Sequence, residues 1–270
     1  MIGQKNSSND LILIDSHCHL HDKEFFNDDQ RQVMYQRAID QKIGMICVGT
    51  DAETSRQAVE FTKDRDNTWA IIGIHPHDAK NGGVSDIRRL LEENNPKIVG
   101  IGEIGLDYFY DNSDRATQQC ILREQLSLAQ EYNLPISFHI RDEKSANGVV
   151  WRDFWPIFDE FIRLRGVLHS FTDTQENLDN GFQRGLLIGL NGISTFTKDQ
   201  KQIELYKNIP LDKILFETDA PFLTPKPFRG TINEPSYVRL VAEYWAEQRN
   251  IDFAMLAKIA TNNTRQIFGV

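Results

Sequence analysis

Four histidines and two acidic residues form the most informative pattern in this sequence, because their side chains are of the kinds that bind divalent metals. They are His17, His19, Glu103, His139, His169 and Asp219. Imidazole nitrogens and carboxylate oxygens, with no thiolate in the set, suit Zn, Mg, Mn, Fe or Co and do not distinguish between these ions. We therefore expect these residues to hold divalent metal.

The spacing of His17 and His19 is informative if their segment is a β-strand. Side chains two residues apart then lie on one face, with Asp15 on the same face and Cys18 on the other. Two imidazoles on one face can chelate a metal ion. An isolated H-x-H also arises by chance around a buried, hydrogen-bonded histidine, so this interpretation depends on the remaining residues of the set.

Each of the other four residues also has an ordinary structural interpretation. Glu103 lies between glycines in GIGEIG, where a bound cation or a distant Lys or Arg would compensate its buried charge. His139 and His169 each follow an apolar run, as hydrogen-bonded core histidines also do. Asp219 ends ILFETD with Glu217 on the same face, and a helix cap is its alternative role.

The size of the set indicates more than one metal ion. Six ligands exceed what one catalytic ion with an open coordination position requires. A carboxylate that bridges two ions about 3.5–4 Å apart is typical of sites that cleave phosphodiesters and amides. We therefore expect two divalent metal ions.

The elements that must position these residues alternate regularly along the chain. Short apolar, β-branched runs predict strands at 11–18, 45–50, 69–76, 98–105, 135–141, 166–172, 186–193 and 214–221. Amphipathic stretches predict helices at 28–41, 51–64, 84–93 and 114–132, with closing helices at 234–248 and 252–268. Asp51 and Asp114 are placed to cap two of them, and Pro135 and Pro210 follow helix ends.

Eight strands that alternate with helices predict an α/β fold, a single (β/α)₈ TIM barrel. All seven histidines stand in or just beyond the C-terminal half of an expected strand, and that end of a barrel builds the active site. The alternative is an open doubly wound sheet with a Gly-rich fingerprint after an early strand. GIGEIG lacks the G-x-G-x-x-G spacing, which favours the barrel.

Composition restricts the class of protein. The 30 Lys and Arg residues against 39 Asp and Glu give a net charge of −9, the wrong sign for a bulk nucleic-acid binder. We expect a disordered N-terminal tail at 1–10 and one domain at 11–270. Three widely spaced cysteines without a CxxC pair, and no apolar run of about 18 residues, predict a cytoplasmic protein without membrane segments. We also expect a monomer.

The sequence resembles the TatD family of metal-dependent hydrolases, deoxyribonuclease-like proteins of the amidohydrolase superfamily. The resemblance covers almost the whole chain and preserves the order of the landmarks. They are IDSHCHL (14–20), GIHPHD (73–78), GEIGLDYF (102–109), LPISFHIRD (134–142), GVLHSFT (166–172), LFETDAPFL (215–223), NEP (233–235) and TNNTRQIF (261–268). Members often read RGKRNEP where this chain has RGTINEP, and HCFTG where it has HSFTD.

The resemblance implies a role for each ligand. His17 and His19 would bind one metal with Asp219, His139 and His169 would bind the second, and Glu103 would bridge the two. It also implies divalent-metal-dependent hydrolysis of nucleic acid, with single-stranded DNA ends as the substrate of a 3'-5' exonuclease.

A metal-activated water is the nucleophile that we expect, with Glu103 and Asp219 as the catalytic residues. Asp219 or its neighbour Glu217 would take the proton of that water. His75, Arg141 and Arg229 are the candidate substrate-binding residues, with Lys226 as a further basic candidate, whereas His21 and His77 are expected to face solvent.

Two other functions fit the same residues. One is a metal-dependent hydrolase of a small amide, lactone or ester, because the barrel fold does not fix the substrate. The other is a non-catalytic metal-dependent scaffold, against which the complete ligand set argues.

Overall fold

A ring of eight parallel strands forms the centre of the molecule. The computed structural model describes residues 11–110, 112–145 and 147–270, so the tail expected at 1–10 lies outside the described residues. The strands are β1 Leu13–Cys18, β2 Ile43–Val48, β3 Thr68–Ile72, β4 Ile98–Asp107, β5 Ile136–Arg141, β6 Gly166–Leu168, β7 Leu187–Leu190 and β8 Ile214–Phe216. Each pairs in parallel with the next in chain order, which confirms the predicted barrel.

The ring closes between β8 and β1, just beyond the last residues of β8. The backbone N–H of Asp219 donates to the carbonyl of His17 at 2.9 Å, and that of His19 donates to the carbonyl of Ala220 at 2.8 Å. Three of the expected metal ligands therefore belong to the seam of the barrel.

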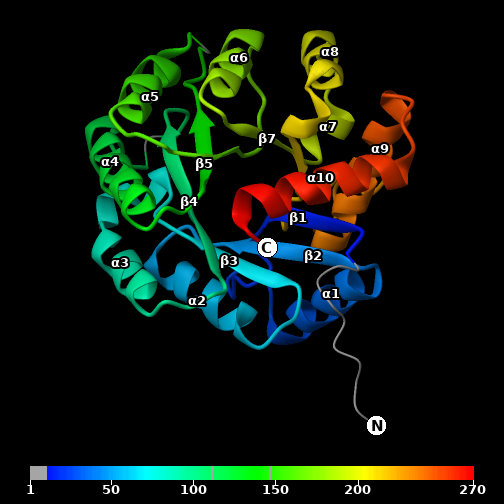
Figure 1. Ribbon diagram of the computed structural model, residues 1–270, viewed down its shortest axis with the longest axis horizontal. Helices are drawn as coiled ribbons and strands as arrows, with labels where there is room; N and C mark the ends of the chain where they lie inside the picture. Colours follow the sequence, from blue (N-terminus) through cyan, green and yellow to red (C-terminus); the bar gives the residue numbers. More distant parts are fainter. Residues whose placement is uncertain (1–10, 111, 146) are drawn as a thin grey trace.

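Helices surround the ring, as expected where a parallel sheet is buried on both faces (Figure 1). The α-helices are α1 Asp28–Asp40, α2 Ala52–Lys63, α3 Val84–Glu92, α4 Arg115–Glu131, α5 Val149–Asp159, α6 Gln175–Gln183, α7 Ile193–Phe196, α8 Gln200–Asn208, α9 Val238–Gln248 and α10 Phe253–Phe268. Short 3₁₀ helices lie at η2 Pro76–Asn81, η3 Leu211–Lys213 and η4 Pro235–Tyr237. Asp51 and Asp114 cap α2 and α4 as predicted, each accepting a backbone N–H three residues on.

The apolar core has two parts. A large cluster fills the layer between strands and helices, and a smaller one lies inside the barrel. The inner cluster contains Ile14, Ile46 and Leu215 together with Ile267 and Phe268 of α10. Helix α10 therefore covers one end of the barrel, in front of the strands in Figure 1, and leaves the other end for the polar residues.

The register of two strands shifts by one residue close to the expected ligands. In β1 the shift lies between Asp15 and Cys18, and in β4 it lies between Ile101 and Ile104. Such irregularities re-aim side chains and are common next to active sites. His17 and Glu103 lie within these two intervals, and their side chains turn toward the barrel axis.

The register shift makes one sequence prediction wrong. Asp15 was expected on the face of His17 and His19, but alternation does not continue through the irregularity. Leu13 packs in the outer cluster and Ile14 in the inner one, so Asp15 falls on the outer side. Its carboxylate accepts hydrogen bonds from the N–H and hydroxyl of Thr218, which fastens β1 to the segment after β8.

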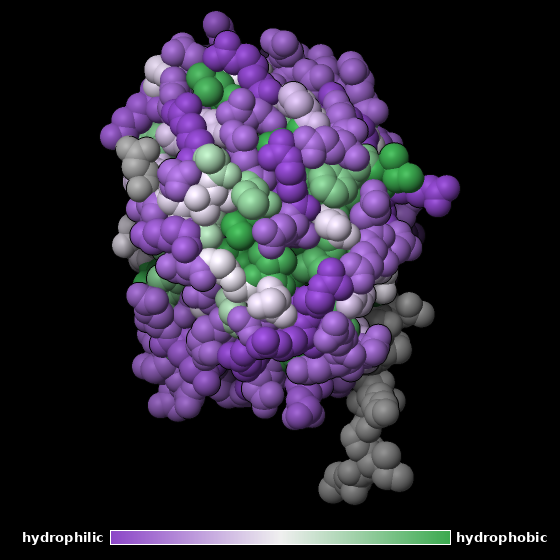
Figure 2. Space-filling view, turned by 90° about the vertical axis from the view of Figure 1, so that its left-hand side faces the viewer, coloured by the Kyte–Doolittle hydropathy of each residue, from purple (hydrophilic) through white to green (hydrophobic). Residues whose placement is uncertain are grey.

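The surface of the side that carries α3, α4 and α5 is mostly hydrophilic, with a small group of hydrophobic residues near its middle (Figure 2). Across residues 11–110, 112–145 and 147–270, no helix combines the length and the hydropathy that crossing a membrane requires.

Candidate metal centre

The six expected ligands converge at the open end of the barrel, although they come from five strands or the segments just after them. His169 and Asp219 lie beyond the ends of β6 and β8, which are shorter than the apolar runs suggest. His19 Nε2 lies 3.3 Å from Asp219 Oδ1, and His169 Nε2 lies 3.7 Å from the same oxygen. The sequence-based grouping of these side chains therefore corresponds to one cluster in space.

Glu103 lies at the centre of this cluster and presents its two oxygens to different histidines. Oε2 is 3.4 Å from His17 Nε2 and 3.9 Å from His19 Nε2. Oε1 is 2.8 Å from His139 Nδ1 and 3.8 Å from His169 Nε2. One carboxylate thus lies between two pairs of imidazoles.

Polar contacts around the cluster orient three of the imidazoles through one ring nitrogen each, and the other nitrogen faces Glu103 or Asp219. His19 Nδ1 donates to the carbonyl of Val48 at 2.7 Å, which leaves the lone pair of Nε2 toward Glu103 and Asp219. His139 Nε2 lies 2.8 Å from Asp107 Oδ2, and His169 Nδ1 lies 2.9 Å from Glu217 Oε1. A carboxylate can only accept from a ring N–H, so neutral His169 carries its proton on Nδ1 and leaves Nε2 unprotonated. His139 faces a carboxylate through both nitrogens, since its Nδ1 lies 2.8 Å from Glu103 Oε1.

His17 completes the set. Its Nδ1 lies 3.1 Å from the Ser137 hydroxyl, and its Nε2 is buried without a hydrogen-bond partner among the described residues. Leaving a buried polar atom unpaired is costly, and a cation at this point would remove the cost. Together with the nitrogen and oxygen donors around it, this atom shows that the residues present fit a divalent metal.

Three groups of side chains bring their ligand atoms within 4.8 Å of one another, as a metal site requires. They are His17 with His19 and Asp219, His17 with His169 and Glu217, and His75 with Glu103 and His139.

His75 differs from the other histidines in these groups, because its Nδ1 accepts the backbone N–H of His77 at 3.1 Å. Neutral His75 then carries its proton on Nε2, 3.7 Å from Glu103 Oε1. That nitrogen is a hydrogen-bond donor and not a metal ligand, which agrees with the sequence-based placing of His75 just outside the ligand set.

The charges of the cluster shift its pKa values in opposite directions. Burial alone would raise the pKa of Glu103, but His75, His17 and His139 hold it well below its usual range. Burial alone would lower the pKa of His169, but the carboxylates of Glu217, Asp219 and Glu103 raise it to about 10. His17 has its pKa lowered by burial and by His169 beside it. The centre therefore favours ionised carboxylates facing imidazoles.

Asp107 and Glu217 hold the ligands in place, and the sequence did not reveal these roles. Asp107 contacts His139 and also His77, whose Nε2 lies 3.0 Å from Oδ2. Glu217 accepts the backbone N–H of Ser170 in addition to its contact with His169, and its side chain is only 1% exposed. The signal for Asp107 was its position four residues after Glu103 on one strand, which places both on one face.

Two histidines were expected to face solvent, and one of them, His21, does not. His21 is 0% exposed because its segment folds beneath the rim, where the side chain of Arg31 donates to its carbonyl. His77 lies in η2, where its contact with Asp107 leaves the side chain 29% exposed. The prediction is wrong for His21, whereas His77 keeps part of its side chain exposed to solvent.

The basic candidates are exposed, at the last residue of β5 and in the loop after β8. The Arg141 guanidinium lies 4.0 Å from the Phe109 ring centre and 5.0 Å from that of Tyr110, and it forms no ion pair within the described chain. Arg229 stacks 3.7 Å over Phe196 and donates to the carbonyl of Thr224, without contacting the six ligands in the described part of the structure. Lys226 is exposed in the same loop.

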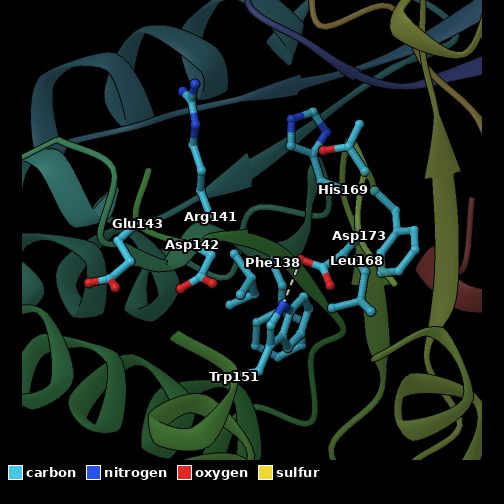
Figure 3. Close-up of a pocket in the computed structure, with 11 residues that line it drawn as sticks. Phe138, Arg141, Asp142, Glu143, Trp151, Leu168, His169 and Asp173 are labelled. Atoms are coloured by element: carbon cyan, nitrogen blue, oxygen red, sulfur yellow. Dashed lines mark hydrogen bonds between the residues drawn. The ribbon is translucent and has the colours of Figure 1, made fainter. Parts of the chain in front are cut away.

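A cavity of about 180 Å³ lies beside His169 and Arg141 (Figure 3). Asp142, Glu143 and Asp173 line it, and Trp151 donates its indole N–H to Asp173 at 2.8 Å. In Figure 3 the Arg141 side chain extends away from Trp151 and Asp173. The three carboxylates make this cavity unsuitable for a phosphate group.

A family model described as TatD related DNase matches residues 14–269. The chain belongs to the TatD family. Its relatives include an uncharacterized metal-dependent hydrolase, YabD of Bacillus subtilis, which is 36% identical over 96% of this chain and 100% of its own length. The 3'-5' ssDNA/RNA exonuclease TatD of Edwardsiella piscicida is 34% identical over 90% of this chain and 94% of its own length.

Comparison with solved structures also finds TatD proteins. The crystal structure of YjjV, a TatD homolog from Escherichia coli, matches with a TM-score of 0.84 and 28% identity over 96% of this chain and 98% of that one. This TatD protein is therefore a metal-dependent hydrolase with a TIM-barrel fold, and its barrel carries a cluster of side chains able to hold metal.

Proposed function

We propose that this TatD protein hydrolyses phosphodiester bonds of single-stranded nucleic acid, releasing nucleotides from the 3' end, with two divalent cations. The observation that supports this most directly is the position of Glu103, whose two oxygens face two separate pairs of imidazoles. A shared carboxylate is the usual way to hold two cations close together for phosphodiester cleavage.

We assign the residues to two cations by which side chains lie together on either side of Glu103. His17, His19 and Asp219 would hold one cation, and His139 and His169 would hold the other, with Glu103 shared between them. When bound, the cations supply Lewis acidity, which stabilises charge on the phosphoryl oxygens and makes water acidic enough to react near neutral pH.

Asp219 is the residue that we propose takes the proton of the attacking water. Its side chain is 15% exposed, whereas that of Glu217 is 1% exposed and already contacts His169 and the Ser170 N–H. The neighbouring imidazoles keep the pKa of Asp219 low in spite of its burial, so the group is available as a carboxylate. Glu217 instead keeps His169 in the required tautomer.

His75 and Arg141 are the proposed substrate contacts nearest to the cluster. His75 presents a ring N–H toward Glu103, from where it can donate to a phosphate oxygen. Arg141 is held by stacking on Phe109, and its N–H groups remain available to a phosphate because no carboxylate of the described residues pairs with it. Arg229, fixed over Phe196, is a more remote contact for the nucleic-acid backbone.

The test is cleavage of a single-stranded oligonucleotide with a 5' label, in Mg²⁺, Mn²⁺, Co²⁺ or Zn²⁺. Wild type should produce a ladder that shortens from the 3' end, and Glu103→Ala and Asp219→Asn should abolish it. Glu92→Ala changes an exposed carboxylate on α3 and is the matched control. Absence of cleavage by wild type in all four ions would overturn the proposal.

Hydrolysis of a small amide, lactone or ester is the second candidate, and the acidic cavity beside His169 favours it. Three carboxylates would repel a phosphate there but would accept hydrogen bonds from a neutral amide. A panel of amides, lactones and esters run beside the oligonucleotide separates the two. Turnover of a panel member with no cleavage of the oligonucleotide would select this alternative.

A further inference from the structure

Two exposed aromatic rings meet at the edge of the metal centre. Phe25 is 40% exposed and Phe222 is 46% exposed, although they lie almost 200 positions apart in the sequence. Their ring centres are 5.1 Å apart in an edge-to-face arrangement. The Phe222 ring is also 6.4 Å from the ring of His19, so this pair adjoins one of the proposed ligands.

The backbone fixes the position of Phe222 relative to the centre. Its N–H donates to the carbonyl of Asp219 at 2.8 Å, which makes a tight turn from the ligand to the ring. The side-chain amide of Asn233, itself fully buried, donates to the carbonyls of both Phe222 and Thr218. The ring is therefore exposed on a well-braced turn.

Phe25 is braced in a similar way. The next residue, Phe26, is buried in the core and donates its N–H to the carbonyl of Asp22. Single exposed aromatic residues are common on protein surfaces. Two rings held edge to face by separate segments beside the cluster form a corner in which a flat apolar ligand can stack on the face of one ring and contact the other.

A positively charged side chain, Arg141, lies on the side of the cluster that carries His77 and His139. Tyr110 is 44% exposed and lies 5.3 Å from His77, and Arg141 stacks on Phe109 next to it. A ligand across the centre thus meets apolar rings on one side and a positive charge on the other. A nucleotide has this combination, since it joins a base with a flat π face to an anionic phosphodiester.

We infer that Phe222 and Phe25 form a stacking platform for the unpaired base of the nucleotide whose phosphodiester is cleaved. The inference rests on the proposed function and adds to it the reason for single-strand preference. A base in a duplex is already stacked and cannot reach the platform without unstacking. The platform therefore selects strand ends with a free base and requires no particular base, because every base has a π face.

The test compares two single-stranded oligonucleotides, one intact and one with a tetrahydrofuran abasic residue at the 3' terminal position. Removing the base should raise the KM of wild type by about 5- to 150-fold, which corresponds to ~1–3 kcal/mol per stacked base. In Phe222→Ala the KM values of the two oligonucleotides should become nearly equal. Phe222→Trp should restore the difference in KM between the intact and the abasic oligonucleotide, and Phe25→Ala should reduce this difference.

Phe228→Ala is the matched control, because Phe228 is 43% exposed in the same loop but stacks on Tyr237. This variant should keep the full difference in KM between the two oligonucleotides. Equal KM values for wild type, or an undiminished difference in Phe222→Ala, would overturn the inference while leaving the nuclease proposal intact.

The nuclease proposal can also fail while the stacking platform remains testable. If wild type cleaves neither oligonucleotide, the nuclease proposal fails, and dissociation constants of the same two oligonucleotides are then compared. Tighter binding of the intact strand that is lost in Phe222→Ala supports the platform. Equal dissociation constants for wild type contradict it.

Discussion

At the scale of single residues, the centre depends on what each imidazole does with its second nitrogen. Asp107, Glu217 and the carbonyl of Val48 each occupy one ring nitrogen of a proposed ligand. The other nitrogen of each ring faces Glu103 or Asp219. Groups outside the proposed ligand set would thereby determine which atoms can bind a metal.

Replacing Asp107 tests this arrangement. Asp107→Ala removes the acceptor of His139 Nε2–H, and we expect metal affinity to fall by about 10- to 100-fold because the ligand loses its orientation. Titration calorimetry with Mn²⁺ measures the change. Asp86→Ala, which alters a carboxylate on α3 that pairs only with Arg89 in the described structure, should leave affinity unchanged. Unaltered affinity in Asp107→Ala would contradict the assigned role.

The ligand types were predictable from the sequence because H-x-H, an acidic residue between glycines and histidines after apolar runs are local patterns. The supporting contacts were not, since Asp107 meets His77 across 30 positions and Glu217 meets the Ser170 N–H across 47. Asp15 and His21 were misplaced because side-chain alternation and loop exposure were assumed to hold where the chain bends inward.

At the scale of elements, the barrel supplies the ligands through irregularities at strand ends. The register shifts in β1 and β4 lie next to His17 and Glu103, and β6 and β8 end before His169 and Asp219. Apolar runs in the sequence revealed the number and order of the strands. They did not show where each ladder ends, because an apolar residue can be buried without being paired in a sheet.

The NEP segment (233–235) connects the loop after β8 with neighbouring elements. Asn233 joins the turn at Thr218 and Phe222, while the buried Glu234 accepts from Ser236 and contacts Arg37 of α1. The segment before α9 therefore holds the loop that carries Asp219 against the barrel.

Removing the Asn233 amide should destabilise the fold. Asn233→Ala leaves the carbonyls of Thr218 and Phe222 without this donor, and we expect the free energy of unfolding to fall by about 2 kcal/mol or more. Urea denaturation followed by circular dichroism measures it. Asn208→Ala, at an exposed amide that contacts only Glu204 in the described structure, should change stability much less. Equal effects of the two substitutions would show that Asn233 is not a brace.

At the scale of the whole molecule, the parallel barrel gathers residues from position 17 to position 219 at one rim. Helix α10 closes the opposite end with Ile267 and Phe268, so polar and apolar groups are separated along the barrel axis. The net charge of −9 leaves little attraction for nucleic acid over the surface as a whole. Under the proposed function, binding would depend on the cations, Arg141 and stacking at the rim.

Metal binding should stabilise the whole fold, because the proposed ligands tie together both sides of the barrel seam. Saturation at 100 times the dissociation constant adds about 2.7 kcal/mol, which corresponds to a rise in Tm of roughly 5–10 °C. Differential scanning fluorimetry with Mn²⁺ and then excess EDTA measures the rise and its reversal. A similar rise in Glu103→Ala would show that the stabilising ion binds elsewhere.

Anomalous diffraction from crystals grown with Mn²⁺ tests the central claim most directly, since it locates the cations without relying on activity. We predict two peaks about 3.5–4 Å apart with Glu103 between them, one beside His17, His19 and Asp219 and the other beside His139 and His169. A single peak, or peaks away from Glu103, would contradict the account.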